Sequence, residues 1–218
     1  ILECALFNAF AYKNEIKTLK NLFKQCKLNV IAVAPIPYTM VQSISKTNLP
    51  EKSDYSLINL SLDSTEIIIV FGGGLIDTKK LPIGYSHIKE AFANTMGLTL
   101  LESDKVLKSY SAGKLKEEEL DVVKKCLSDV LYVWLEGVKL CYEEFLDVKV
   151  HASQMYLTGE GSTIPDVIEL FKNDKWYKEI PFKEVPICKK LNINDFSYIQ
   201  DATGKINSNN WITTQSLN

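Results

Sequence analysis

YSLINLSLDSTEIIIVFGGGLIDTKKLPIG, residues 55–84, is the stretch that decides the fold. Its apolar and β-branched residues form three short blocks, which predict strands over 56–62, 66–71 and 75–82. The glycines at 72–74 predict a hairpin turn, because such turns need positive φ. The first turn carries hydroxyl groups instead, and the main-chain N–H groups of a turn of that kind can cradle a phosphate.

Composition allows a packed core and gives no sign of a nucleic-acid partner. The 218 residues suit one large domain or two small ones, and 46% of them are hydrophobic. A net charge of −2 does not provide the basic face that nucleic-acid binding requires. Five cysteines without a Cys-x-x-Cys pair predict reduced core thiols rather than a zinc site. There is no apolar run of the ~18 residues that span a membrane and no signal peptide, and the opening Ile1 predicts a fragment of a longer protein.

The part before residue 55 predicts a βαβ unit. Residues 1–8 form an apolar run that predicts a buried strand. Asn14 is the expected cap of an amphipathic helix, whose apolar residues recur at three- and four-residue spacing and should lie on a sheet. A second apolar run, 29–36, predicts another buried strand. A strand, a helix and a strand in this order suggest a right-handed crossover.

Helices dominate the rest of the prediction. They are expected over 37–45, 84–97, 103–110, 116–146, 165–171 and 193–200, with one strand over 153–158. Ser103 should cap the third of these helices, and Ser162 or Thr163 should cap the fifth. Gly137 weakens the middle of the long helix, so two shorter helices are an alternative there.

Two turns could bind an anionic ligand. The first, 59–65, lies around the end of the strand predicted over 56–62, and the second joins a strand to a helix start, where glycines let an anionic group approach the backbone. Their candidate residues are Asn59, Ser61, Asp63, Ser64, Thr65, Gly159, Glu160 and Gly161. The alternative is that the Gly-x-Gly segment is only a structural turn. The two histidines, His87 and His151, lie too far apart in sequence to indicate a metal site or a catalytic triad, and His87 should face solvent.

The order and spacing of these parts resemble the actin-like ATPase superfamily, and within it the bacterial FtsA and PilM proteins. The segment before that family's phosphate hairpin is similar to LKNLFKQCKLNVIAVAPIPYTMVQSI (19–44). The strand and helices after the hairpin are similar to GGGLIDTKKLPIGYSHIKEAFANTMGLTLLESDKVLKSY (72–110). The family's adenosine motif is similar to LTGEGSTIPDVIELF (157–171). The resemblance therefore covers about residues 2–171.

This resemblance implies an α/β fold, namely the C-terminal portion of an actin-like (RNase H-like) ATPase fold with a mixed sheet flanked by helices. Residues 1–54 would be the end of the first lobe. Residues 55–218 would be the second lobe, with the phosphate hairpin and the adenosine motif. The implied cofactor is ATP with Mg²⁺, bound by the eight candidate residues of the two turns.

Three positions depart from the family's pattern. Asn59 stands where the family has an aspartate, and Ser61 and Glu160 stand where it has glycines, whereas Thr65 keeps the pattern. Without the carboxylate, the chain lacks a group that could hold metal-bound water, and Glu160 puts a negative charge near an anionic ligand. We therefore expect weak binding of MgATP, a weak ATPase at most, and no activity from the fragment alone.

The implied role is that of a nucleotide-binding scaffold of the FtsA/PilM type, acting in bacterial cell division at the cytoplasmic face of the inner membrane. Type IV pilus assembly is an alternative. A degenerate binding module without nucleotide is another, as is a sugar kinase-like enzyme, which would need an acidic base that we cannot place. The expected partners are proteins of a membrane-associated assembly, with self-association and without nucleic acid.

Overall fold

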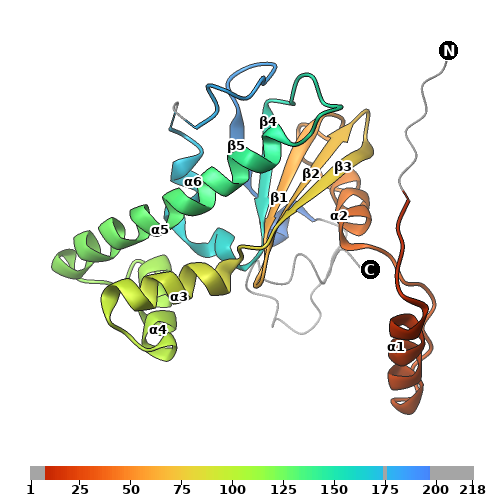
Figure 1. Cartoon of the computed structure of the whole chain (residues 1–218), viewed down its shortest axis with the longest axis horizontal. Coiled ribbons are helices and arrows are strands. Elements are labelled where there is room, and N and C mark those ends of the chain that lie inside the picture. Colours follow the sequence, from red (N-terminus) through yellow and green to blue (C-terminus); the bar gives the residue numbers. More distant parts are fainter. Residues whose placement is uncertain (1–7, 174–175, 197–218) are drawn as a thin grey trace.

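A five-stranded mixed sheet forms the centre of the computed structural model, which describes residues 8–173 and 176–196 (Figure 1). The strand order is β3-β2-β1-β4-β5. The strands are β1 (Tyr55–Leu60), β2 (Thr65–Phe71), β3 (Gly74–Leu81), β4 (Gln154–Thr158) and β5 (Ile187–Lys190). The helices are α1 (Lys13–Gln25), α2 (Ile36–Ser45), α3 (Tyr85–Met96), α4 (Leu100–Ser111), α5 (Glu117–Glu143), η1 (Glu160–Thr163), α6 (Pro165–Leu170) and η2 (Ile193–Asp195).

The sheet joins an antiparallel half to a parallel half at β1. β1, β2 and β3 form the predicted meander, and β1 also pairs in parallel with β4, which pairs in parallel with β5. All six residues of β1 are buried, because this strand has neighbours on both edges and packed layers on both faces. The predicted mixed sheet flanked by helices is confirmed.

Helices cover the two faces of the sheet unequally. Ile58 and Leu60 of β1 belong to the larger core, which α3, α5 and α6 share. Tyr55 and Leu57 belong to a smaller core with α2 on the opposite face, since successive side chains of a strand point to opposite faces. Figure 1 shows the carboxyl-terminal half of α5 in front of the sheet and its amino-terminal half extending past the sheet, with α3 and α4 beside that half.

The long helix α5 is unbroken over 27 residues, so the alternative of two shorter helices is wrong. Its glycine is explained by packing: a Cβ at Gly137 would lie 2.8 Å from Cδ2 of Leu81. A bulky residue there would push α5 away from β3. Trp134, one turn earlier on α5, is buried in the larger core.

The βαβ unit expected before residue 55 is not formed among the residues that the structure describes. Residues 29–35 have no strand conformation, and Ile31 is 98% exposed. An apolar run becomes a strand only where a neighbour accepts its backbone hydrogen bonds, and no described strand lies beside this one. The helix α1 forms as predicted but buries none of its residues, and Figure 1 shows it apart from the sheet. Its cap is Tyr12 rather than Asn14, and the expected strand over 1–8 falls almost wholly outside the described residues.

Two helix starts also differ from prediction. The helix α4 begins at Leu100 because Thr99 and Glu102 form a capping box, so Ser103 lies inside the helix instead of capping it. The helix α6 has Ile164 at its cap position, without a side-chain hydrogen bond. Of the expected last helix, 193–200, the structure describes 193–196, and 193–195 form η2.

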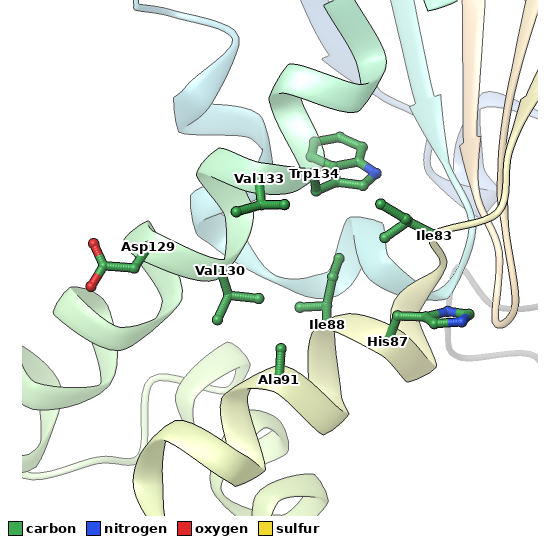
Figure 2. A pocket seen from close by; sticks show the side chains of 8 residues that line it. All are labelled: Ile83, His87, Ile88, Ala91, Asp129, Val130, Val133 and Trp134. Atoms are coloured by element: carbon green, nitrogen blue, oxygen red, sulfur yellow. The ribbon is translucent and has the colours of Figure 1, made fainter. Parts of the chain in front are cut away.

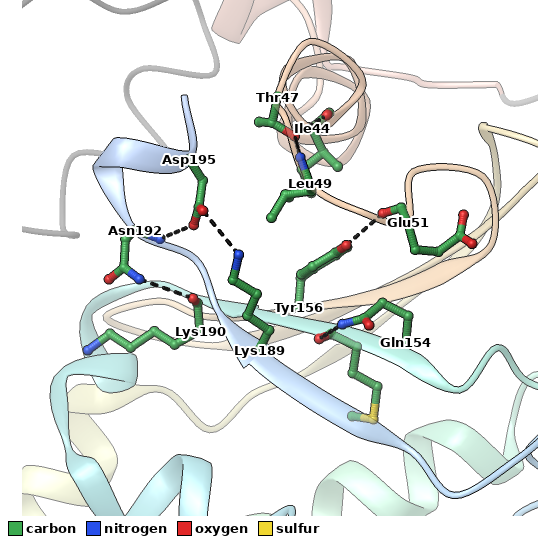
Figure 3. A network of polar contacts seen from close by, with 11 residues as sticks. Ile44, Thr47, Leu49, Glu51, Gln154, Tyr156, Lys189, Lys190, Asn192 and Asp195 are labelled. Carbon is green, nitrogen blue, oxygen red and sulfur yellow. Dashed lines mark hydrogen bonds and ion pairs between the residues drawn. The ribbon is translucent and has the colours of Figure 1, made fainter. Parts of the chain in front are cut away.

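The strand β5 lies in a segment, 187–190, for which the sequence analysis predicts no element. Side chains on its α2 side fix the chain after it. Lys189 pairs with Asp195 at 3.1 Å, and on the neighbouring strand the Tyr156 hydroxyl donates to the Glu51 carbonyl at 2.6 Å (Figure 3). The second contact ties the polar loop before β1 to β4. The division of the chain into lobes at residue 54 stays a prediction, and α2 shares a core with the sheet.

Candidate functional site

The two predicted turns lie side by side, because they follow the carboxyl ends of the central strand β1 and its neighbour β4. β1 and β4 are parallel, so their carboxyl ends meet at the same edge, and Asn59 pairs in register with Thr158. The turn 61–64 follows β1, and Gly159 followed by η1 comes directly after β4. The chain thus brings together segments that are about a hundred residues apart in sequence.

Close packing against β1 explains both glycines of the second turn. Gly159 has φ +92°, and a Cβ there would lie 2.3 Å from the carbonyl oxygen of Leu60. A Cβ at Gly161 would lie 2.3 Å from side-chain atoms of Leu60. The structure therefore requires glycine at these positions even without a ligand, which is the structural alternative raised by the sequence.

Backbone hydrogen bonds from the start of α3 hold the first turn, 61–64, in place. The Tyr85 N–H donates to the Ser61 carbonyl at 2.9 Å, and the Ser86 N–H donates to the Leu62 carbonyl at 2.8 Å. A Cβ at Gly84 would lie 2.3 Å from the Ser64 nitrogen, so only glycine lets the helix start approach this closely. The turn 61–64 is fixed on its hairpin side and on its helix side.

The side chains of the first turn form a small polar surface. The Ser61 hydroxyl donates to the Ser64 carbonyl at 2.7 Å and lies 3.4 Å from the Ser64 hydroxyl. Asp63 is exposed, and its Oδ1 lies 3.5 Å from the Ser86 hydroxyl. Both serines are half-buried, so their hydroxyls are fixed by the turn and still border solvent.

Thr65 has a different position from its neighbours. Its hydroxyl donates to the Ile83 carbonyl at 2.6 Å and accepts a hydrogen bond from the Trp134 indole N–H at 2.8 Å. The side chain is fully buried. It connects β2, the start of α3 and α5, and contact with a phosphate through this residue stays a prediction.

The second turn is stabilised by hydrogen bonds between its own side chains and backbone. The Ser162 hydroxyl donates to the Gly159 carbonyl and the Thr163 hydroxyl to the Glu160 carbonyl, both at 2.7 Å. The prediction that Ser162 or Thr163 caps the following helix is therefore wrong, because these hydroxyls complete the 3₁₀ turn. Glu160 is half-buried, and the two turns, 59–65 and 159–164, contain no lysine or arginine to offset its charge.

The chain resembles known proteins in its structure rather than in its sequence. No family model matches the chain, and no curated protein matches it. Among solved structures, one titled "PilM-PilN type IV pilus biogenesis complex" is 13% identical, covers 93% of this chain and 56% of its own, and has a TM-score of 0.62. The ethanolamine utilization protein EutJ of Carboxydothermus hydrogenoformans is 14% identical over 77% of this chain and 56% of its own (TM-score 0.56). MreB 5 of Spiroplasma citri, solved with AMPPNP, is 11% identical over 95% of this chain and 64% of its own (TM-score 0.55). The fold is actin-like. The chain spans somewhat over half the length of these actin-like chains.

The donor atoms around the two turns do not suit a protein-held Mg²⁺. Among the described residues, no three His, Cys, Asp or Glu side chains lie close enough together to bind a metal ion. Asn59 provides a neutral oxygen where a carboxylate would provide charge.

A pocket of about 370 Å³ lies nearby between α3 and α5, but its lining is mostly apolar (Figure 2). The pocket is lined by Ile83, His87, Ile88, Ala91, Asp129, Val130, Val133 and Trp134.

Sequence reasoning missed Gly84, Ser86 and Thr158 as neighbours of the two turns that form the candidate site. Gly84 was expected only to open a helix, and its tight contact with Ser64 follows from the return of the chain to the first turn. Thr158 could be found only from the register between β1 and β4. His87 is exposed as predicted, and its Nδ1 accepts a hydrogen bond from the Gly84 N–H at 3.2 Å.

Proposed function

We propose that this chain carries the nucleotide-binding lobe of an actin-like scaffold protein of the FtsA/PilM type, which recruits protein partners at the cytoplasmic face of a membrane. The observation that carries the proposal is the meeting of the two turns at the carboxyl ends of β1 and β4. In open α/β sheets, ligands bind outside the carboxyl ends of parallel strands, where the sheet topology changes. At β1, the parallel half of this sheet changes to the antiparallel half.

The polar turn 61–64 suits the anionic end of such a ligand. Its serine hydroxyls are held at the surface, and the helix α3 begins directly beside it. The partial positive charge of a helix start favours an anion nearby. The negative charges of Asp63 and Glu160 oppose the binding of an anion. We therefore propose that nucleotide binds weakly and acts as a conformational switch rather than as a hydrolysed energy source.

The protein partner is the less defined part of the proposal. The neighbour solved in the PilM-PilN complex supports a role in type IV pilus assembly, and the resemblance to FtsA supports a role in cell division. In both roles, attachment to the membrane would depend on partner proteins or other segments. Among the described residues, no helix has the length and hydropathy needed to cross a bilayer.

The test is equilibrium binding of ATP and ADP to the purified chain, followed by ligand-observed NMR at millimolar nucleotide. The variant Ser61→Ala/Ser64→Ala should weaken binding by about threefold to tenfold, because two hydroxyl contacts are lost. Ser109→Ala on α4, a serine outside the two turns, is the control and should bind like the wild type. If the wild type binds neither nucleotide, the chain is a binding module without nucleotide. Steady release of phosphate would instead favour a kinase-like or ATPase enzyme.

A further inference from the structure

At the end of the sheet, two buried polar atoms have no hydrogen-bond partner among the residues that the structure describes. They are Oδ1 of Asn59 and the hydroxyl oxygen of Thr158. Asn59 is 3% exposed and Thr158 is fully buried. Because burying a polar atom without a partner costs folding free energy, such atoms are uncommon and call for an explanation.

The two atoms belong to one place. Asn59 and Thr158 are paired in register on adjacent parallel strands, so their side chains point to the same face of the sheet. A Cβ at Gly159 would lie 2.8 Å from Oδ1 of Asn59, so the glycine turn begins directly against this oxygen. Ser56 is also a buried polar residue of β1, but it lies at the other end of the strand, away from the two turns.

The chemistry of the pair determines what it can recognise. Both atoms accept hydrogen bonds, and the Thr158 hydroxyl can also donate one. Neither carries a charge, so the pair attracts a divalent cation far less than a carboxylate would. A neutral group that both donates and accepts, such as a ribose hydroxyl or a water molecule held by a ligand, can donate to Oδ1 of Asn59 and accept from the Thr158 hydroxyl without a metal.

We propose that Asn59 and Thr158 together bind a hydroxyl or a ligand-held water of the nucleotide, and that nucleotide binding to this chain therefore does not depend on a divalent cation. This inference rests on the proposed function. It adds Thr158 to the site and assigns Asn59 a role that an aspartate in its place would not have. The hydrogen-bonding capacity left unused in the free protein is then used in the bound one.

The experiment measures ATP binding by ligand-observed NMR, in EDTA and in excess Mg²⁺, together with thermal melting. Wild-type affinity should differ by less than about twofold between the two conditions. Thr158→Val keeps the side-chain shape and removes the hydroxyl. It should weaken binding about threefold to tenfold while raising the melting temperature by about 2–4 °C. Ser56→Ala removes another buried hydroxyl of β1 and should leave binding unchanged. Asn59→Asp should make binding depend on Mg²⁺ by about tenfold or more.

The outcomes separate this inference from the proposed function. Wild-type binding that EDTA abolishes would overturn the inference and leave the nucleotide role intact. Equal binding by Thr158→Val and the wild type would also overturn it. If the wild type binds no ATP under either condition, both the inference and the proposed function are wrong.

Discussion

Replacing Gly159 with alanine tests the packing on which the candidate site depends. The residue has φ +92° and ψ 173°, a region that is essentially limited to glycine and costs another residue about 1–3 kcal/mol. The new Cβ would also lie 2.3 Å from the Leu60 carbonyl oxygen, so the turn or the end of β1 must move. Displacing packed backbone of this kind costs about 1–3 kcal/mol more. We expect Gly159→Ala to lower the free energy of unfolding by about 4 kcal/mol.

Gly113→Ala is the matched control. Gly113 also has a positive φ, +65°, but nothing lies within 4 Å of its Cβ position, so only the backbone cost of about 1 kcal/mol applies. Urea unfolding, followed by the fluorescence of the buried Trp134 and Trp176, gives both values. A difference between the two variants below about 1 kcal/mol would show that the glycine turn does not pack against Leu60 as described.

Three further predictions concern charge, pH and a helix contact. Glu160→Gln should strengthen ATP binding by about threefold to fivefold, because a repelling carboxylate is removed, whereas the exposed Glu169→Gln should have no effect in the same titration. Burial lowers the pKa of His151 in the folded protein below its ordinary value of 6.5. The folded state is therefore stabilised above pH 6.5, and this stability is lost as the pH falls from 6.5 to the folded-state pKa, by up to about 1.4 kcal/mol per pH unit. His151→Phe should flatten this dependence in urea melts at pH 5 to 8, and the exposed His87→Gln should keep it. Tyr110→Phe removes a hydrogen bond of 2.5 Å from α4 to a carboxylate of α6 and should cost about 1.5–3 kcal/mol; no change in the urea midpoint would show that α4 and α6 are not coupled.

Local patterns made the meander and the second turn predictable. Hairpin glycines with positive φ at 72 and 73, and the order of strand, Gly-x-Gly and proline-started helix after Gln154, depend on neighbours in sequence. The burial of Trp134 follows from the same kind of local pattern, because its position repeats with the apolar residues of α5.

What could not be predicted depends on partners distant in sequence. The run 29–36 has the composition of a strand, but composition does not say whether another strand lies beside it. β5 is short and ends in Lys189 and Lys190, and only its pairing with β4 makes it a strand. The position of Thr158 beside Asn59 likewise follows from the register between β1 and β4, which no local pattern contains.

The position of β1 between β2 and β4 has a consequence for synthesis in the cell. β2 follows β1 within a few residues, but Met155, the partner of Ser56 on the other side, is made 99 residues later (155 − 56). At about 5–20 residues per second, this edge of an apolar strand waits roughly 5–20 s for its neighbour. During that time the meander offers an unpaired edge to any other nascent strand. We therefore expect the yield of soluble protein to depend on chaperones and on translation speed between β3 and β4, more than on the stability of the finished fold.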